Sequence, residues 1–171
     1  MKNFPLILTL LFLSACGFHP VYGVNKYTSV GVEDKLASIQ IENIPNREGQ
    51  YLRNALIDRF YRDERPESPV YTLSIDPINE GKRDLDITKN SDATRGQLKL
   101  QTAFQLKNIA TGQIVLERNI QTIASYNILS SEFTNSVSEQ NTRENGLEDL
   151  ARQIEQQIDL MFKHDDLKDV P

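Results

Sequence analysis

Apolar and polar residues alternate along four stretches of the chain, and a period of two predicts β-strands that bury one face. The predicted strands are residues 36–44, 71–76, 98–106 and 114–124. The last two flank Ala110-Thr111-Gly112, a turn signal that predicts a long antiparallel hairpin. Residues 82–89 carry two apolar residues among charges and are predicted to form an edge strand or a loop.

Two other stretches have apolar residues at helical spacing, which predicts amphipathic helices. The first helix covers residues 47–63, and its apolar positions are Tyr51, Leu52, Ala55, Leu56 and Phe60. The second follows a predicted capping box of Ser136 and Glu139, and Gly146 is expected to kink or delay it. Its apolar stripe consists of Leu147, Leu150, Ala151, Ile154, Ile158, Met161 and Phe162.

This order of elements predicts an α+β fold, a two-layer sandwich with two amphipathic helices packed on one face of a mostly antiparallel sheet. The other face of the sheet is then expected to be polar. We predict a single domain over residues 36–163 and a charged, frayed tail over residues 164–171.

The N-terminus has the pattern of a bacterial lipoprotein signal. Lys2 supplies positive charge, and residues 4–13 form an apolar run that is too short to cross a bilayer, which takes about 20 residues. The run ends in Leu13-Ser14-Ala15-Cys16, where small residues let a peptidase approach the backbone. We therefore predict a signal peptide over residues 1–15 and a lipidated tether over residues 16–35.

Lipidation would occur on the thiol of Cys16, and a diacylglyceryl group together with an N-acyl chain would hold the protein on a membrane almost permanently. We expect no cofactor other than this covalent lipid. Gly17 follows the cysteine, whereas inner-membrane retention signals typically place Asp there, so the predicted location is the outer membrane. The alternative is a plain secretory signal, with Cys16 as an ordinary thiol that has no second cysteine to pair with.

Composition excludes several classes of function. Without residues 1–15 the chain keeps 156 residues, with 18 basic and 24 acidic side chains and a formal net charge of −6, which argues against a nucleic-acid partner. Its two histidines, His19 in the tether and His164 in the tail, complete neither a catalytic triad nor a metal site. The sequence has no phosphate-binding loop and no nucleophile elbow. We therefore predict that the protein is not an enzyme, with no catalytic or metal-binding residues.

Five basic residues crowd into the strand region between residues 82 and 99, which is notable in an acidic protein. They are Lys82, Arg83, Lys89, Arg95 and Lys99. Such side chains can pair with the phosphates of lipid headgroups, arginine bidentately and lysine as a point charge. The alternative is a charged sheet edge that resists aggregation, because Asp84, Asp86 and Asp92 lie among the cations.

Two segments resemble the lipopolysaccharide-assembly lipoproteins of the LptE family, especially its alphaproteobacterial branch. In that branch a Gly-Phe-x-Pro-x-Tyr pattern follows the acylated cysteine, and the matching residues here are Cys16, Gly17, Phe18, Pro20 and Tyr22. The second segment is residues 125–158, where the matching residues are Tyr126, Asn127, Arg143, Leu150, Ala151 and Ile154. In layout, the similarity covers the whole mature chain.

The resemblance implies a non-enzymatic outer-membrane lipoprotein that helps the LptD β-barrel to assemble, plugs its lumen and helps to deliver lipopolysaccharide to the outer leaflet. It also implies lipopolysaccharide binding through basic residues, for which the five above are candidates on charge alone. The implied partners are an LptD-like barrel, lipopolysaccharide and the membrane through the lipid anchor. The alternative function is a lipid-binding auxiliary lipoprotein of a phospholipid transport system, which can share the two-layer form.

Overall fold

The computed structural model of the chain describes residues 30–61, 65–87 and 93–168. The helices and strands are α2 (Val30–Ala37), β1 (Ile39–Ile41), α3 (Asn46–Phe60), β2 (Tyr71–Ile75), β3 (Asn79–Ile87), β4 (Ala93–Asn108), β5 (Ile114–Asn127) and α4 (Glu132–Lys168). The predicted α+β class is confirmed, and the described residues form three helices where the sequence predicted two.

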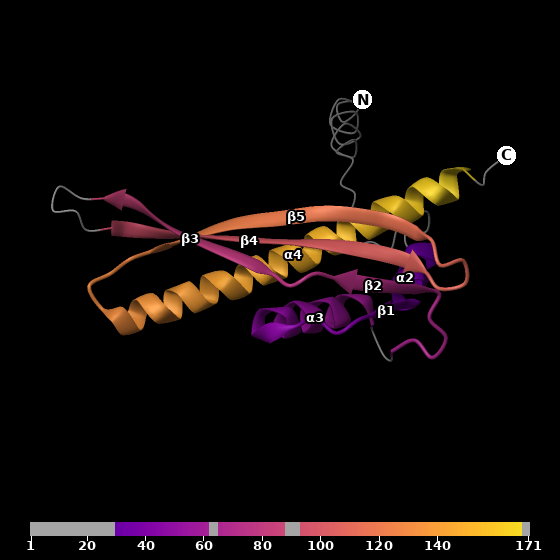
Figure 1. The fold of residues 1–171 in the computed structure, drawn as a ribbon, viewed down its shortest axis with the longest axis horizontal. Helices are drawn as coiled ribbons and strands as arrows, with labels where there is room; N and C mark the ends of the chain where they lie inside the picture. The colour runs from indigo at the N-terminus through magenta and orange to yellow at the C-terminus, as the bar shows by residue number, and fades with distance from the viewer. Residues whose placement is uncertain (1–29, 62–64, 88–92, 169–171) are drawn as a thin grey trace, which may run out of the picture. The chain divides into compact units, whose positions relative to one another are not determined.

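The five-stranded sheet is organised around β4, which pairs with three other strands. β5 runs antiparallel along one side of β4. Along the other side β2 pairs with the end of β4 and β3 pairs with its beginning, both antiparallel (Figure 1). β1 lies outside β2 and is parallel to it. The predicted hairpin is thus present as β4 and β5, and the sheet is mostly antiparallel as predicted.

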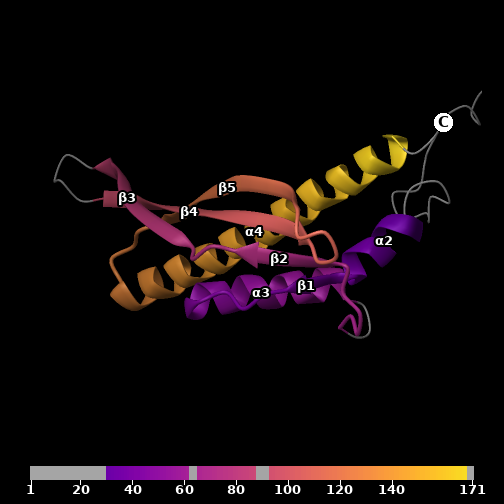
Figure 2. The same ribbon diagram turned by 45° about the vertical axis from the view of Figure 1, so that its right-hand side comes forward.

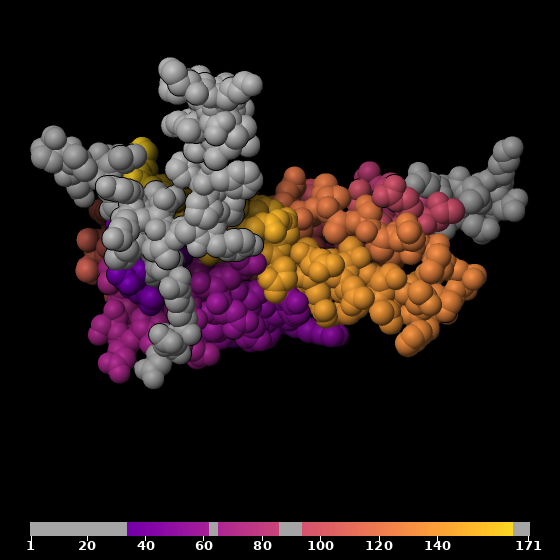
Figure 3. All heavy atoms as spheres, turned by 180° about the vertical axis from the view of Figure 1, so that it is seen from behind, coloured from indigo at the N-terminus to yellow at the C-terminus, as the bar shows by residue number. Residues whose placement is uncertain are grey.

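The core lies between one face of this sheet and the helices α3 and α4. Seen from behind, α3 in purple and α4 in orange to yellow cover that face (Figure 3). From β4 the buried apolar residues are Leu98, Leu100, Phe104 and Leu106, and from α4 they are Leu147, Leu150, Ala151, Ile154, Ile158 and Phe162. Because side chains alternate along a strand, the odd-numbered residues of β4 and their neighbours on β3 and β5 point the other way. We call this second side of the sheet the open face.

The helix α4 begins earlier than the sequence predicted, because Ser131 and not Ser136 caps it. The Ser131 hydroxyl accepts the Thr134 N–H at 3.4 Å. The Asn135 side chain accepts the Leu129 N–H at 2.7 Å and donates to the Leu129 carbonyl at 2.8 Å. The predicted capping-box pair therefore lies inside the helix, where Glu139 is available for contacts with the sheet.

Gly146 does not interrupt α4, which is continuous over 37 residues (Figure 2). The glycine is instead buried against the sheet. A Cβ atom at this position would lie 2.8 Å from Leu100 Cδ1 and 3.4 Å from Thr122 Cγ2. The missing side chain therefore allows the helix backbone to approach β4 and β5 closely.

Both ends of the expected domain are helical where the sequence suggested other structure. The first predicted strand, residues 36–44, contains only the three residues of β1, and α2 occupies residues 30–37, which were divided between tether and strand. The alternation reflects burial of a strand only at Ile39 and Ile41. Leu36 is also buried, but as a residue of α2. At the other end α4 continues through Lys168, into the predicted frayed tail over residues 164–171.

Candidate functional site

The open face of the sheet is mainly polar and rich in amide side chains, as the alternation predicted. On β4 it presents Arg95, Gln97, Lys99, Gln101, Ala103, Gln105 and Lys107. On β5 it presents Glu117, Asn119, Gln121, Ile123, Ser125 and Asn127. Cross-strand pairing brings Gln101 opposite Gln121 and Ala103 opposite Asn119. This side of the sheet therefore offers hydrogen-bonding groups over most of its area.

Three of the five predicted basic residues lie together at the β3 end of the open face. Arg83 is opposite Gln97 on β4, and its diagonal neighbours on that strand are Arg95 and Lys99. Such diagonal neighbours are about 7–8 Å apart, within reach of long side chains. All three side chains are exposed. We call Arg83, Arg95 and Lys99 the basic trio.

Asp84, which lies among these cations in the sequence, does not share their surface, and Asp92 lies outside the described residues. Asp84 is opposite Gly96 and points to the helix side of the sheet, since it alternates with Arg83. Among the described residues, the stretch of the open face from 79 to 85 on β3 and from 95 to 101 on β4 has no carboxylate. The pleat of β3 thus places Arg83 and Asp84, which are neighbours in the sequence, on opposite faces of the sheet.

Lys82 lies on the opposite side of the sheet from the basic trio. It is paired with Leu98, whose side chain is buried beneath α4, and its ammonium forms an ion pair with Glu139 of that helix. The same ammonium lies 5.9 Å from the centre of the Tyr126 ring. The structure therefore separates Lys82 from the other candidates. Lys89 and Cys16 lie outside the described residues.

Lys82 belongs to a charged network that holds the first half of α4 against the sheet. Glu139 accepts hydrogen bonds from the Tyr126 hydroxyl and from Arg143 Nη2, both at 2.9 Å. Arg143 also donates from Nε and Nη2 to Glu80 of β3, at 2.6 and 2.8 Å. Its guanidinium is largely shielded, with 15% of the side chain exposed. We call Glu80, Lys82, Tyr126, Glu139 and Arg143 the helix-sheet network.

The charges in this network stabilise one another. The hydrogen bond from Lys82 is the largest cause that lowers the pKa of Glu139, from 4.5 to about 2. Hydrogen bonding to Glu80 raises the pKa of Arg143, and hydrogen bonding to Glu139 raises that of Lys82. Lys82, Glu139 and Arg143 are therefore charged at neutral pH.

Acid should remove the contribution of Glu139 to stability. Because the pKa of Glu139 is lowered in the folded protein, that contribution is fully present above about pH 4.5. It is lost as the pH falls towards about 2. At pH 7 we expect Glu139→Gln to lower the free energy of unfolding by about 1–3 kcal/mol, and at pH 3 by clearly less. Urea unfolding at both pH values measures this. Glu132→Gln, at an exposed position of the same helix, is the control. An equal loss at both pH values would contradict the assignment.

A glycine makes room for the aromatic member of the network. A Cβ atom at Gly96 of β4 would lie 2.4 Å from Cζ of Tyr126, so the ring of Tyr126 lies directly over the glycine backbone. This placement buries the ring and directs its hydroxyl to Glu139. The sequence alone did not predict this role of Gly96.

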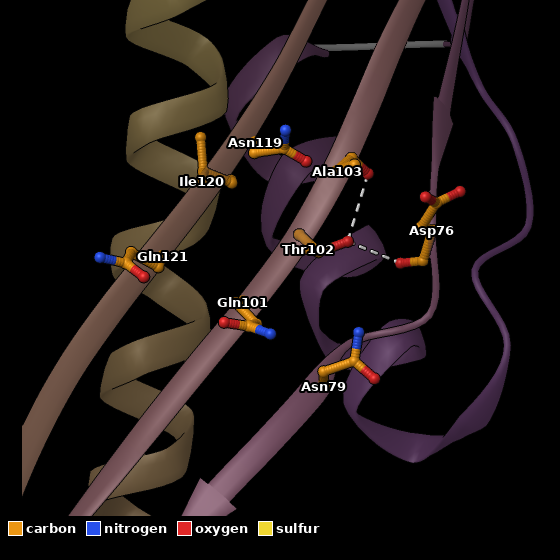
Figure 4. Close-up of a pocket in the computed structure, with 8 residues that line it drawn as sticks. All are labelled: Asp76, Asn79, Gln101, Thr102, Ala103, Asn119, Ile120 and Gln121. Atoms are coloured by element: carbon orange, nitrogen blue, oxygen red, sulfur yellow. Dashed lines mark hydrogen bonds between the residues drawn. The ribbon is translucent and has the colours of Figure 1, made fainter.

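The open face has a hollow of about 520 Å³ beside Ala103, between the end of β2 and the beginning of β3 (Figure 4). Pro77 has no N–H and cannot donate to the ladder, so regular pairing stops at Ile75 and resumes at Asn79. The Thr102 hydroxyl donates to the Asp76 carbonyl at 2.7 Å and holds the segment between β2 and β3 against β4. We call this feature the amide hollow, because its exposed rim carries Asn79, Gln101, Asn119 and Gln121 together with Asp76.

Residues 36–158 match the family model described as LptE, lipopolysaccharide-assembly. The chain belongs to the LptE family. Membership confirms the family resemblance, and the match includes the second of the two similar segments, residues 125–158, but not the first, which begins at Cys16. It makes the protein a lipopolysaccharide-assembly lipoprotein of a non-enzymatic, outer-membrane family. A search of curated protein sequences gives no match.

Solved structures of bacterial lipoproteins share the fold of this LptE-family chain. A lipoprotein from Caulobacter crescentus has 19% identity and a TM-score of 0.62, with 79% of this chain and 97% of that one covered. Rare lipoprotein B from Shewanella oneidensis has 11% identity and a TM-score of 0.56, with coverage of 76% and 96%. A minor lipoprotein from Acinetobacter baumannii has 21% identity and a TM-score of 0.54, with coverage of 71% and 90%.

Within the described ranges, no group of three or more His, Cys, Asp or Glu residues is placed to hold a metal ion. No helix among the same residues is long and apolar enough to cross a membrane.

The residues that the sequence failed to identify are Glu80 and Glu139 as partners of Arg143. Glu80 and Arg143 are 63 positions apart in the chain, so neither spacing nor composition relates them. Arg143 and Tyr126 were noted only through the family resemblance. The structure gives both residues a physical role in attaching α4 to the sheet.

Proposed function

We propose that this LptE-family chain is anchored in the outer membrane by lipid on Cys16, helps an LptD-like β-barrel to assemble, plugs its lumen and helps to deliver lipopolysaccharide to the outer leaflet. The family match over residues 36–158 is the observation that carries the proposal. The basic trio is the proposed contact for lipopolysaccharide phosphates.

Size and surface chemistry support the plug. The 156 residues that remain without residues 1–15 would, as one compact unit, have a radius of gyration of about 15 Å, which suits the lumen of a barrel of about 26 strands and not one of 8. Barrel lumens are polar, so a plug should present polar side chains. The open face has this character, since it consists mainly of amides and charged groups.

Isolation of the protein with its partners tests the proposal. A tag after Pro171 and gentle solubilisation of membranes should recover a large β-barrel in roughly a one-to-one ratio. The Cys16→Ser protein should leave the membrane fraction if it is expressed without a barrel partner, which tests the lipid anchor separately. Recovery of inner-membrane transporter subunits alone would contradict the proposal and favour a phospholipid-transport auxiliary.

A further inference from the structure

We propose that the amide hollow is a saccharide-binding site. Asp76 and the four rim amides would hydrogen-bond the hydroxyl groups of one or two adjoining sugar units, with the Ala103 methyl group as the floor. The basic trio is a different part of the open face, so this is a second site with a different ligand chemistry.

The rim consists of two rows that run across the strands. The first row is Asp76, Ala103 and Asn119, and the second is Asn79, Gln101 and Gln121. Strands lie about 4.8 Å apart and alternate residues about 7 Å apart, so each row of three spans about 10 Å. Ala103 is the one small side chain in this grid, and its size leaves the hollow (Figure 4).

The rim side chains have unused hydrogen-bonding capacity. Each amide provides two N–H donors and an acceptor oxygen, and a carboxylate provides acceptors only. The five polar side chains are exposed and form no hydrogen bond with another described residue. Gln105, on the same face outside the hollow, instead donates to Glu117 at 3.0 Å. Sugar hydroxyls donate and accept at once, so they match a rim of this composition.

The charge of the hollow favours a neutral sugar over a phosphate. Asp76 would repel an anion, and the basic trio lies farther along β4 and β3, beyond Gln101 and Asn79. The open face therefore places sugar-binding groups and phosphate-binding groups side by side. A ligand that carries sugars next to phosphates fits this arrangement. Assigning that ligand as lipopolysaccharide rests on the proposed function, whereas sugar binding by the hollow does not.

Calorimetric titration of the full lipoprotein, in a detergent without sugar headgroups, tests the inference. The two probes are lipopolysaccharide core oligosaccharide freed of lipid and phosphate, and dextran. We expect Gln101→Ala to weaken core binding about fivefold, as for the loss of one hydrogen bond. Ala103→Phe should fill the hollow and weaken binding tenfold or more. The matched controls are Gln97→Ala on the same strand and Ser125→Phe on the same face, and both should bind as the unaltered protein does.

The outcomes separate the site, its ligand and the proposed function. Tighter binding of the core than of dextran identifies lipopolysaccharide sugars as the ligand, and equal binding indicates a general saccharide site. Absence of binding to either probe overturns the inference, as do equal effects of hollow and control variants. If the unaltered protein recovers no barrel but the hollow still binds core sugars, the proposed function fails and the inference stands.

Discussion

Phe104→Ala is expected to lower the free energy of unfolding by about 3–5 kcal/mol. Phe104 lies in the half of β4 that pairs with β2 and is 1% exposed, among the core residues contributed by the sheet and both long helices. Its removal would leave a cavity that the surrounding side chains fill only in part. Urea unfolding followed by circular dichroism measures the loss.

Phe133→Ala provides a control with the same chemical change. Phe133 lies in the first turn of α4 and is 80% exposed, so its truncation should alter stability by no more than about 0.5 kcal/mol. Similar losses for the two variants would contradict the described core. Because Phe104→Ala would impair any activity by unfolding the protein, every binding variant also needs a stability measurement.

Replacing the whole basic trio by serine should weaken lipopolysaccharide binding about 100-fold. Each exposed cation contributes about 1 kcal/mol to a phosphate contact, and Arg83, Arg95 and Lys99 are adjacent on one surface. The affinity of the unaltered protein should also fall as salt increases, because exposed charges are screened. Titration with lipopolysaccharide at low and high salt measures both effects.

The charge-matched control replaces Lys107, Arg152 and Lys163 by serine. These exposed residues lie outside the trio, so the variant has the same net charge with the trio intact. Lys82→Ser is a second control that should lower stability, through loss of the ion pair with Glu139, and leave lipopolysaccharide affinity unchanged. If the trio variant and the charge-matched control weaken lipopolysaccharide binding equally, binding depends on net charge and not on the trio.

The strands that border the core could be predicted from sequence because burial imposes a simple period on them. In β4 the residues Leu98, Leu100, Phe104 and Leu106 alternate with polar side chains, and the structure buries all four. The stripe on α4 is equally regular. The start of that helix was less predictable, because Ser131 and Ser136 both have a hydroxyl at a plausible capping position and only the fold selects between them.

β3 could not be oriented from its sequence because polar residues occur on both of its faces. Leu85 lies on the open-face side of the strand, opposite Arg95, whereas Glu80 and Lys82 point towards α4. The ion pairs with Arg143 and Glu139 make this orientation favourable, and they join distant parts of the chain. The candidate cations were therefore found by composition, but their division between two faces depended on pairing register.

Because α4 continues without a break past Gly146, it connects two regions of the domain that could otherwise unfold separately. One helix contacts the β3 end of the sheet through Arg143 and the α3 side of the core through Glu148 and Glu155, which pair with Arg59. A break at Gly146 would have allowed these regions to open independently. With a single rigid rod between them, the domain should lose its structure as one cooperative unit.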